Sequence, residues 1–178
     1  MRPRHTPGLG AILLLVAVVA LLVSGDGGCD GDQDPRDRRD EGPPVAAAEV
    51  VRVVDGDTIE VTVDGRTEDV RYIGIDTPES VTPGEPVECF GRRAGALNER
   101  LVSGRRVRLR FDRERRDRYG RLLAYVHARG RFVNAELVRR GFARTLTIPP
   151  NDAHAALFAR LERQAGGAGR GLWDVCVP

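Results

Sequence analysis

Short runs in which apolar and polar residues alternate predict β-strands in the first half of the folded part of the chain. Residues 58–63 place Ile, Val and Val on one face and polar residues on the other, which is typical of a half-buried strand. Residues 49–54 are rich in β-branched side chains, and 70–75 form a similar run. Asp64-Gly65 is a strong hairpin signal. We therefore expect three antiparallel strands within residues 49–75.

A Pro- and Gly-rich loop is expected at residues 81–86, and the rest of the chain carries both helical and strand patterns. We expect two more strands, over 107–111 and 121–127, and three helices, over 92–102, 133–140 and 152–164. The strand over 107–111 carries arginines on its polar face. Asp152 is the expected N-cap of the last helix, and Gly141 ends the one before it.

The order of these elements predicts an α+β domain. Three strands, a helix, two strands and further helices fit a five-stranded OB-fold β-barrel with three helices. A doubly wound α/β sheet fits badly, because strands and helices do not alternate along the chain.

The residues before the barrel have a different character. Residues 2–5 are basic and 9–23 are almost wholly apolar, so 1–25 read as a signal peptide or an N-terminal anchor, and the chain is expected to be exported. The apolar run is short for a membrane span of about 20 residues. Cys29 follows two glycines, as at a lipoprotein cleavage site, although Asp26 stands where an aliphatic residue is expected. Cleavage, anchoring and lipidation of Cys29 therefore stay open.

Residues 26–48 read as a charged, Pro-containing disordered linker, because they hold too few large apolar side chains to form a core. The folded domain is expected over 49–178. All 28 basic residues of the chain are Arg, and the excess over acidic residues is small. This charge suits a polyanionic substrate, but many solvated surfaces look the same.

Carboxylates gather at the ends of the predicted strands. Asp57 follows the first strand and Asp76 ends the third, and neighbouring strand ends can bring the two side chains together. Two carboxylates in one pocket repel unless a cation lies between them, and oxygen ligands favour Ca²⁺ or Mg²⁺. The Thr77 carbonyl is a further candidate ligand, since Pro78 fixes the turn after it. Glu79 lies close enough to orient or deprotonate water. Each segment alone also fits an ordinary turn.

Two arginines are candidates for binding phosphate. Arg71 shares a strand face with aliphatic residues and therefore needs an anionic partner, and Arg121 follows Gly120 at the start of a strand. Either one can bind phosphate with two hydrogen bonds and stabilise developing charge. Asp117 and Tyr119 are expected to position this turn. A structural salt bridge is the competing interpretation for both arginines.

These segments resemble the thermonuclease family, whose best-known member is staphylococcal nuclease. The resemblance covers about residues 49–176 and is carried by residues 54–58, 71–79, 117–121 and 132–141. It implies an OB-fold barrel with three helices, and Ca²⁺-dependent cleavage of DNA and RNA that leaves 3′-phosphates. Single-stranded nucleic acid is the expected preferred substrate, and a monomer is the expected state.

The resemblance also assigns roles to residues. It implies that Asp57, Asp76 and Thr77 are the Ca²⁺ ligands and that Glu79 activates water. Arg71 and Arg121 match the phosphate-binding pair, and Tyr119, with Asp117 beside it, matches the tyrosine at the terminal phosphate. Cys89 and Cys176 match a secreted subgroup in which the two cysteines pair; an exported chain would meet the oxidising conditions that this needs.

One departure from the family is plain in the sequence. Residues 145–150 read Thr-Leu-Thr-Ile-Pro-Pro where the staphylococcal enzyme has two tyrosines that stack on the base. Two other functions compete with this one: a binding module without catalysis, since OB folds often bind oligonucleotides, and a surface-attached interaction protein. The complete set of carboxylates and arginines argues against both.

Overall fold

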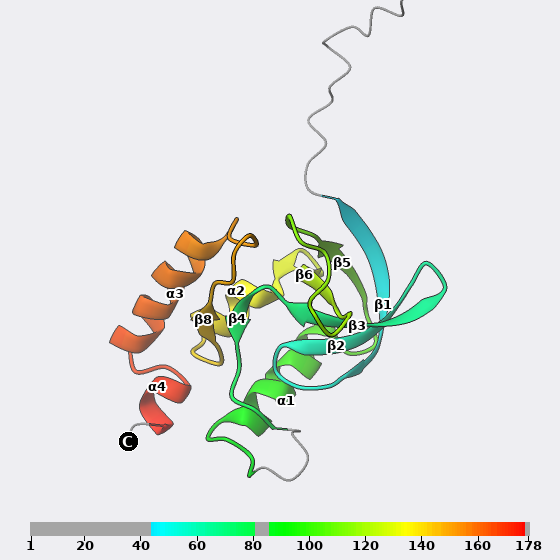
Figure 1. The fold of residues 1–178 in the computed structure, drawn as a ribbon. Coiled ribbons are helices and arrows are strands. Elements are labelled where there is room, and N and C mark those ends of the chain that lie inside the picture. The colour runs from blue at the N-terminus through cyan, green and yellow to red at the C-terminus, as the bar shows by residue number, and fades with distance from the viewer. Residues whose placement is uncertain (1–43, 81–85, 177–178) are drawn as a thin grey trace, which may run out of the picture. The chain divides into compact units, whose positions relative to one another are not determined.

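The barrel of the computed structural model is built from antiparallel neighbours and closed by one parallel pair. β2 (Thr58–Val63) pairs with β1 (Val45–Val53) and β3 (Arg66–Tyr72), β1 with β5 (Arg106–Arg110), and β5 with β6 (Leu122–Ala128), all antiparallel. β6 then runs parallel to β3, with Val70 opposite Leu122, and this pairing closes the barrel (Figure 1). The predicted five-stranded barrel of the OB type is confirmed.

The structure describes residues 44–80 and 86–176, all within one unit, 40–178. The expectations for residues 1–43, including the signal or anchor at 9–23 and lipidation of Cys29, lie outside the described residues. Within the described ranges, no helix has both the length and the apolar character that crossing a membrane requires.

The barrel interior follows the predicted alternation. Ile59, Val61, Val70 and Leu109 are fully buried. Tyr72 is buried as well, and its hydroxyl donates to Asn98 Oδ1 at 2.9 Å. Asn98 lies on α1 (Gly91–Val102), so this buried hydrogen bond fixes the helix against the barrel.

Two strand boundaries differ from the sequence predictions. β1 begins at Val45, inside the segment predicted as linker, because residues 45–49 pair with β5. The predicted strand over 70–75 is divided: β3 ends at Tyr72, and β4 (Gly74–Asp76) leaves the barrel to pair with β8 (Arg144–Leu146). Gly74 has φ 79°, and a Cβ there would lie 2.6 Å from the Phe158 ring, so only glycine fits this bend.

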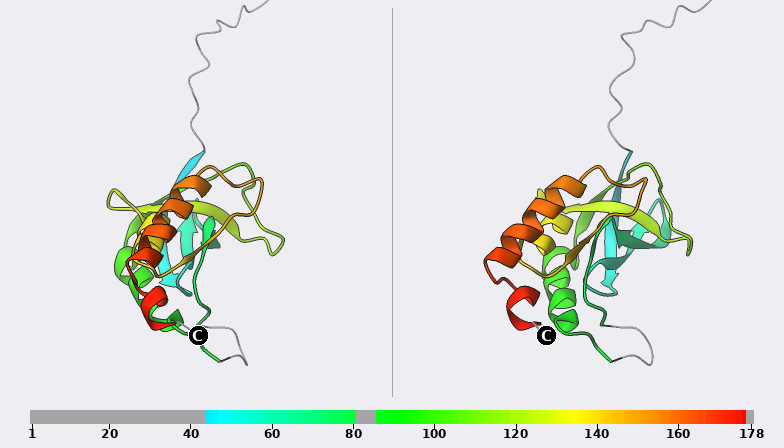
Figure 2. Two further views of the ribbon diagram at one scale, coloured as in Figure 1. Left: turned by 90° about the vertical axis from the view of Figure 1, so that its left-hand side faces the viewer. Right: turned by 60° about the vertical axis from the view of Figure 1, so that its left-hand side comes forward.

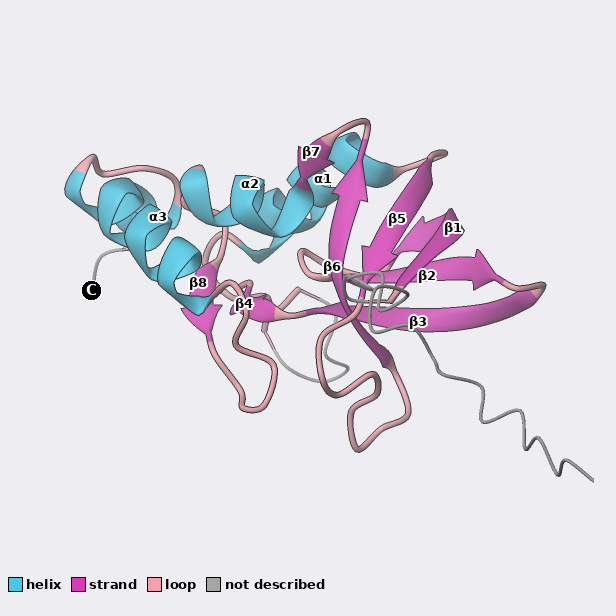
Figure 3. Cartoon of the chain, turned by 90° about the horizontal axis from the view of Figure 1, so that it is seen from above, coloured by secondary structure: helices cyan, strands magenta, loops and turns pink. Residues whose placement is uncertain are grey.

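The helices gather beside the barrel (Figures 2 and 3). α2 (Val133–Arg139) follows the two-residue strand β7 (Arg131–Phe132) and packs on α3 (Ala155–Gly167). The predicted N-cap at Asp152 is wrong, because α3 begins at Ala155 and only the backbone carbonyl of Asp152 accepts from the Ala155 N–H. A short fourth helix, α4 (Leu172–Val175), was not predicted.

A disulfide joins Cys89, just before α1, to Cys176, just after α4, as expected. It ties segments 87 residues apart in the sequence.

Candidate active site

The two predicted metal-binding carboxylates meet at the open end of the β2–β3 hairpin, the end opposite its turn, with an arginine between them. Arg71, on β3, forms ion pairs of 2.6 Å with Asp57 Oδ2 and 2.7 Å with Asp76 Oδ1. A further hydrogen bond of 3.1 Å from Arg71 to the Ile75 carbonyl holds the guanidinium in place. The anionic partner that the sequence demanded for Arg71 is thus this carboxylate pair.

Asp57 is the most buried charged residue of the site, with 4% of its surface exposed. Burial raises the pKa of its carboxyl to about 7, Arg71 opposes this shift, and the nearby carboxylates of Asp55 and Asp76 add to it. A buried carboxylate beside further carboxylates favours a cation in its neighbourhood. The donors present are oxygens only, which is the chemistry that Ca²⁺ prefers. The donor chemistry therefore suits the Ca²⁺ that the resemblance implies, at two carboxylates whose cation in this structure is Arg71.

Thr77 is held directly against Asp57. Its backbone N–H donates to Asp57 Oδ2 at 2.7 Å, and its hydroxyl donates to the same oxygen at 3.1 Å. Among residues 44–80 and 86–176, no group of three His, Cys, Asp or Glu side chains is placed to share a metal ion. A cation here would rest on Asp57, Asp76, backbone oxygen and water.

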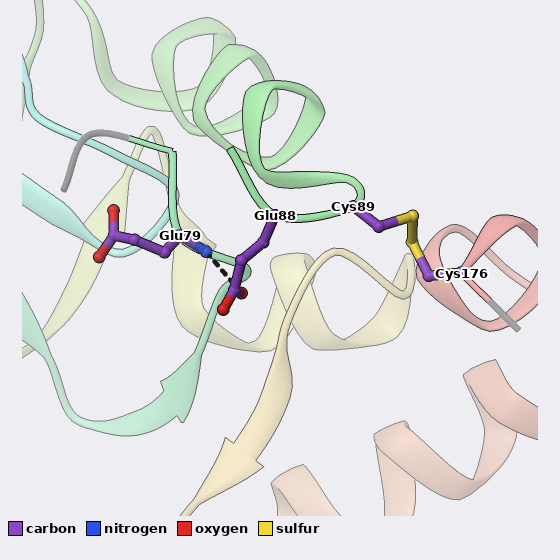
Figure 4. Close-up of a disulfide and its surroundings, with 4 residues drawn as sticks. All are labelled: Glu79, Glu88, Cys89 and Cys176. Atoms are coloured by element: carbon purple, nitrogen blue, oxygen red, sulfur yellow. Dashed lines mark hydrogen bonds between the residues drawn. A yellow bond between two sulfur atoms is a disulfide. The ribbon is translucent and has the colours of Figure 1, made fainter. Parts of the chain in front are cut away.

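Glu79 lies after β4 and is paired through its backbone with Glu88, just before α1. Its N–H donates to Glu88 Oε2 at 2.9 Å, and its carbonyl accepts from the Glu88 N–H at 2.9 Å. Gly91 lies against the same carbonyl, where a Cβ would come within 2.5 Å of the oxygen. Cys89, next to Glu88, carries the disulfide, while the Glu79 side chain points away from it (Figure 4). The backbone of Glu79 is therefore anchored on one side and its half-buried carboxylate extends on the other.

Arg121 is oriented by Asp117. Asp117 Oδ2 accepts from Arg121 Nε at 2.7 Å, and Oδ1 accepts from the backbone N–H groups of Tyr119 and Arg121 at 3.0 Å each. Burial alone would raise the pKa of the Asp117 carboxyl, but the hydrogen bonds from Arg121 hold it below its usual range. Tyr119 is 68% exposed, and the guanidiniums of Arg118 and Arg121 lie 4.7 and 5.5 Å from its ring centre. Asp117 thus fixes both the backbone of the turn and the guanidinium of Arg121.

A cavity of about 590 Å³ brings the two arginines together. Arg71 and Arg121 line it with Tyr119, and Arg71 also belongs to the carboxylate cluster. Asp57, Asp76 and Glu79 are not among its lining residues. The cavity therefore adjoins the carboxylates through Arg71 and extends to the turn that carries Tyr119 and Arg121.

A further wall of this cavity comes from the segment 145–150, to whose aliphatic residues the sequence assigned no role. It is formed by Leu146, at the end of β8, and Ile148, which are 40% and 61% exposed. Asn151 holds the loop in place, because its side-chain amide exchanges two hydrogen bonds of 2.8 Å with the backbone of Glu114. The signal that could have found this wall is the pair of large aliphatic residues in a short polar, Pro-ending segment.

Comparison with known proteins agrees with this geometry. Residues 69–175, more than half of the chain, match the family model described as staphylococcal nuclease homologue. A thermonuclease of Staphylococcus intermedius is 38% identical over 168 residues, which is 93% of this chain and 96% of the relative. A thermonuclease of Staphylococcus hyicus is 38% identical over 70% of this chain and 74% of its own length. Endonuclease YncB of Bacillus subtilis is 39% identical over 69% of this chain and 59% of its own length. The chain therefore belongs to the staphylococcal nuclease, or thermonuclease, family.

Proposed function

We propose that this protein is an exported, Ca²⁺-dependent nuclease that hydrolyses DNA and RNA without sequence specificity and leaves 3′-phosphates. The coarse activity, hydrolysis of phosphodiester bonds in nucleic acid, follows from the family. One observation carries the proposal further: two oriented arginines, from β3 and from the turn before β6, line one cavity beside a carboxylate pair in which Asp57 is buried and Asp76 is exposed.

The arginines are assigned to the phosphate. Arg121 is held through Nε by Asp117, which orients its terminal N–H groups. Both terminal nitrogens of Arg71 are paired with Asp57 and Asp76, and a cation bound to those carboxylates would release Arg71 for the phosphate. Preorganised donors aimed at oxygens that gain charge stabilise the transition state more than the ground state. Arg71 and Arg121 would therefore lower the barrier for attack at phosphorus.

The carboxylates of Asp57 and Asp76 and the Thr77 carbonyl would hold Ca²⁺. When bound, the cation would neutralise charge on the phosphate and help to position it. Burial raises the pKa of Asp57 because its carboxylate is poorly solvated, so a bound cation would stabilise the charged form of this residue most.

Glu79 is assigned as the general base. It lies beyond the Thr77-Pro78 turn, with its backbone held by Glu88 and its carboxylate turned away from that contact. In the proposed reaction Glu79 takes a proton from water, the water oxygen bonds to phosphorus, and the bond from phosphorus to the 5′-oxygen breaks. The departing 5′-oxygen takes a proton from solvent water, protonated Glu79 returns its proton to solvent, and the phosphate stays on the 3′-oxygen.

The substrate range follows from what the cavity offers. Its charged groups address phosphate, and Leu146 and Ile148 give the base an apolar but non-aromatic wall. Neither contact reads a base edge, which favours cleavage without sequence specificity, and an exposed base needs an unpaired or frayed strand.

Export and a monomeric state complete the proposal. The basic and apolar residues at 2–23 support export, and the Cys89–Cys176 disulfide suits an oxidising compartment. Release, anchoring through residues 9–23 and lipidation of Cys29 remain alternatives; fractionation of expressing cells, followed by blotting for the protein, separates them. Elution of the purified protein at the size of a dimer would contradict the monomer.

The test is digestion of denatured DNA and of RNA by the full-length protein with Ca²⁺, with Mg²⁺ and with EGTA. We expect degradation that requires Ca²⁺ and fragments whose 3′ ends become extendable only after phosphatase treatment. Binding without degradation by a folded, disulfide-intact sample would instead support the non-catalytic binding module.

A further inference from the structure

The outer surface of the barrel at β5 carries unpaired positive charge away from the cavity. β5 alternates inward Val107 and Leu109 with outward Arg106, Arg108 and Arg110. We call this surface, together with Arg129 and Arg131 around the β6–β7 turn, the basic face. Only Arg106 has an ion-pair partner among the described residues, the exposed Glu49 at 3.1 Å. The other four arginines form no ion pair within the described part of the chain.

The neighbours of these arginines leave the face open. Opposite Arg108 stand Ala47 on β1 and His127 on β6, and opposite Arg110 stand Val45 and Tyr125. Small exposed residues thus flank one side of β5. On the other side the His127 ring stacks on Phe132, with ring centres 4.6 Å apart and planes 11° from parallel. An arginine ladder beside half-buried rings is the kind of surface that binds the backbone and bases of a single strand.

The positive charges of Arg108 and Arg110 affect the neighbouring histidine. Burial lowers the pKa of His127, and the positive charges of Arg108 and Arg110 lower it further, with a smaller contribution from His154. Besides Glu49, which pairs with Arg106, the carboxylate of Asp112 lies near this surface, and it accepts hydrogen bonds from the Tyr125 hydroxyl at 2.9 Å and the Ala153 N–H at 3.2 Å. Arg108 and Arg110 therefore raise the local potential, and neither forms an ion pair with a carboxylate of the described residues.

The basic face is connected to the active-site cavity along β6. Leu123 lines the cavity, and Tyr125 and His127 follow it on the same side of the strand. At about 3.3 Å per residue, Leu123 and His127 are about 13 Å apart, a distance of a few nucleotides. His154, whose ring centre lies 4.5 Å from that of Tyr125, covers the strand between them. A chain leaving the cavity could pass over this loop and reach Arg110 and then Arg108.

We propose that the basic face is a second binding surface for nucleic acid, which holds the phosphates of a single strand beyond the nucleotides in the cavity. The inference rests on the proposed nuclease function for the identity of the strand. It makes affinity depend on substrate length: a trinucleotide fills only the cavity, whereas a 40-nucleotide strand also reaches the basic face.

The experiment measures binding of a fluorescent 40-nucleotide oligothymidylate to the full-length protein in EGTA over a range of salt concentrations. For Arg108→Gln with Arg110→Gln, we expect affinity at low salt to fall roughly 10-fold and the slope of log K against log salt to shrink by about 1.4, which corresponds to two phosphate contacts on a single strand. Turnover of a trinucleotide should stay unchanged. The Arg108→Lys, Arg110→Lys variant should keep the slope.

The matched control is Arg160→Gln with Arg163→Gln, two exposed arginines on α3, which removes the same charge elsewhere. Equal losses in the two double Gln variants would overturn the proposal, because only net charge would then matter. A β5 variant that loses binding to phosphatidylglycerol vesicles but keeps the oligothymidylate slope would also overturn it, in favour of a membrane surface.

The two proposals can fail separately. Cleavage by the wild-type protein, together with an unchanged slope of log K against log salt in the Arg108→Gln, Arg110→Gln variant, would overturn only the proposal of the basic face. Binding that depends on Arg108 and Arg110 without any cleavage would sink the nuclease proposal and leave the surface in place.

Discussion

The two sides of the cavity are built in opposite ways. On the phosphate side, Asp57 is 4% exposed, and Arg71 is locked between two carboxylates at the end of barrel strands. On the base side, Leu146 and Ile148 are 40% and 61% exposed and come from the short strand β8 and the segment after it. Charged groups can direct chemistry only when their neighbours fix them, whereas an apolar wall needs only to be present. The first side should therefore govern the rate of the reaction, and the second the affinity for substrate.

Loss of a phosphate-side arginine should have the largest effect. For Arg121→Ala we expect kcat on denatured DNA to fall about 10²–10³-fold, because a preorganised donor to the transition state is removed. Arg113→Ala, an exposed arginine of the same connection, is the matched control and should stay within a few-fold of wild type. A wild-type rate for Arg121→Ala would show that the cavity is not the reaction centre.

Removal of the disulfide should have the next largest effect on kcat, because Cys89 adjoins Glu88, which holds the backbone of Glu79. Cys89→Ala with Cys176→Ala should lower the free energy of unfolding by about 2–4 kcal/mol. We also expect a partial loss of kcat at a temperature at which the variant stays folded, since Glu88 adjoins Cys89 and holds the Glu79 backbone. Urea unfolding and initial rates measure the two effects. Cys29→Ala should change neither, and an unchanged kcat in the double variant would separate the disulfide from the site.

A change on the base side should alter affinity alone. Leu146→Tyr would place an aromatic ring in the cavity wall, and stacking on a base is worth about 1–3 kcal/mol. We therefore expect KM for a trinucleotide to fall roughly 5–100-fold with kcat nearly constant. Val51→Tyr, an exposed residue on β1 outside the cavity, serves as the control. A lower KM in both variants would argue against a base site at Leu146.

A last prediction concerns pH and separates the buried carboxylate from the rest of the site. Burial raises the pKa of Asp57 from 3.8 to about 7, so the folded protein binds more protons than the unfolded chain between these values. Stability without Ca²⁺ should therefore fall as pH rises from about 4 to 7. Ca²⁺ must displace that proton, and its affinity should drop up to 10-fold for each pH unit below 7.

Thermal unfolding with and without Ca²⁺ across this range checks both trends. Asp57→Asn should flatten the pH dependence of the metal-free protein. An equally steep dependence in that variant would assign the proton to another group.

The same contrast explains how far the sequence could predict the site. Alternation and turn signals gave the barrel strands, and the strand ends correctly brought Asp57 and Asp76 together. These are consequences of local pattern. The β4–β8 pairing was missed, because three residues such as 144–146 carry no period and are placed only by long-range contacts. The two aliphatic residues Leu146 and Ile148 can be seen in the sequence, but their place in the cavity wall depends on that pairing and on the Asn151 contacts, which are long-range.

The most direct test of this division of labour is kcat on saturating denatured DNA for the variant in which both Leu146 and Ile148 are replaced by Ala. If the base side serves only affinity, kcat should stay within about 2-fold of wild type while KM rises, because the transition-state contacts of Arg71 and Arg121 are untouched. A loss of kcat as large as that of Arg121→Ala would contradict the separation of chemistry from binding in this site.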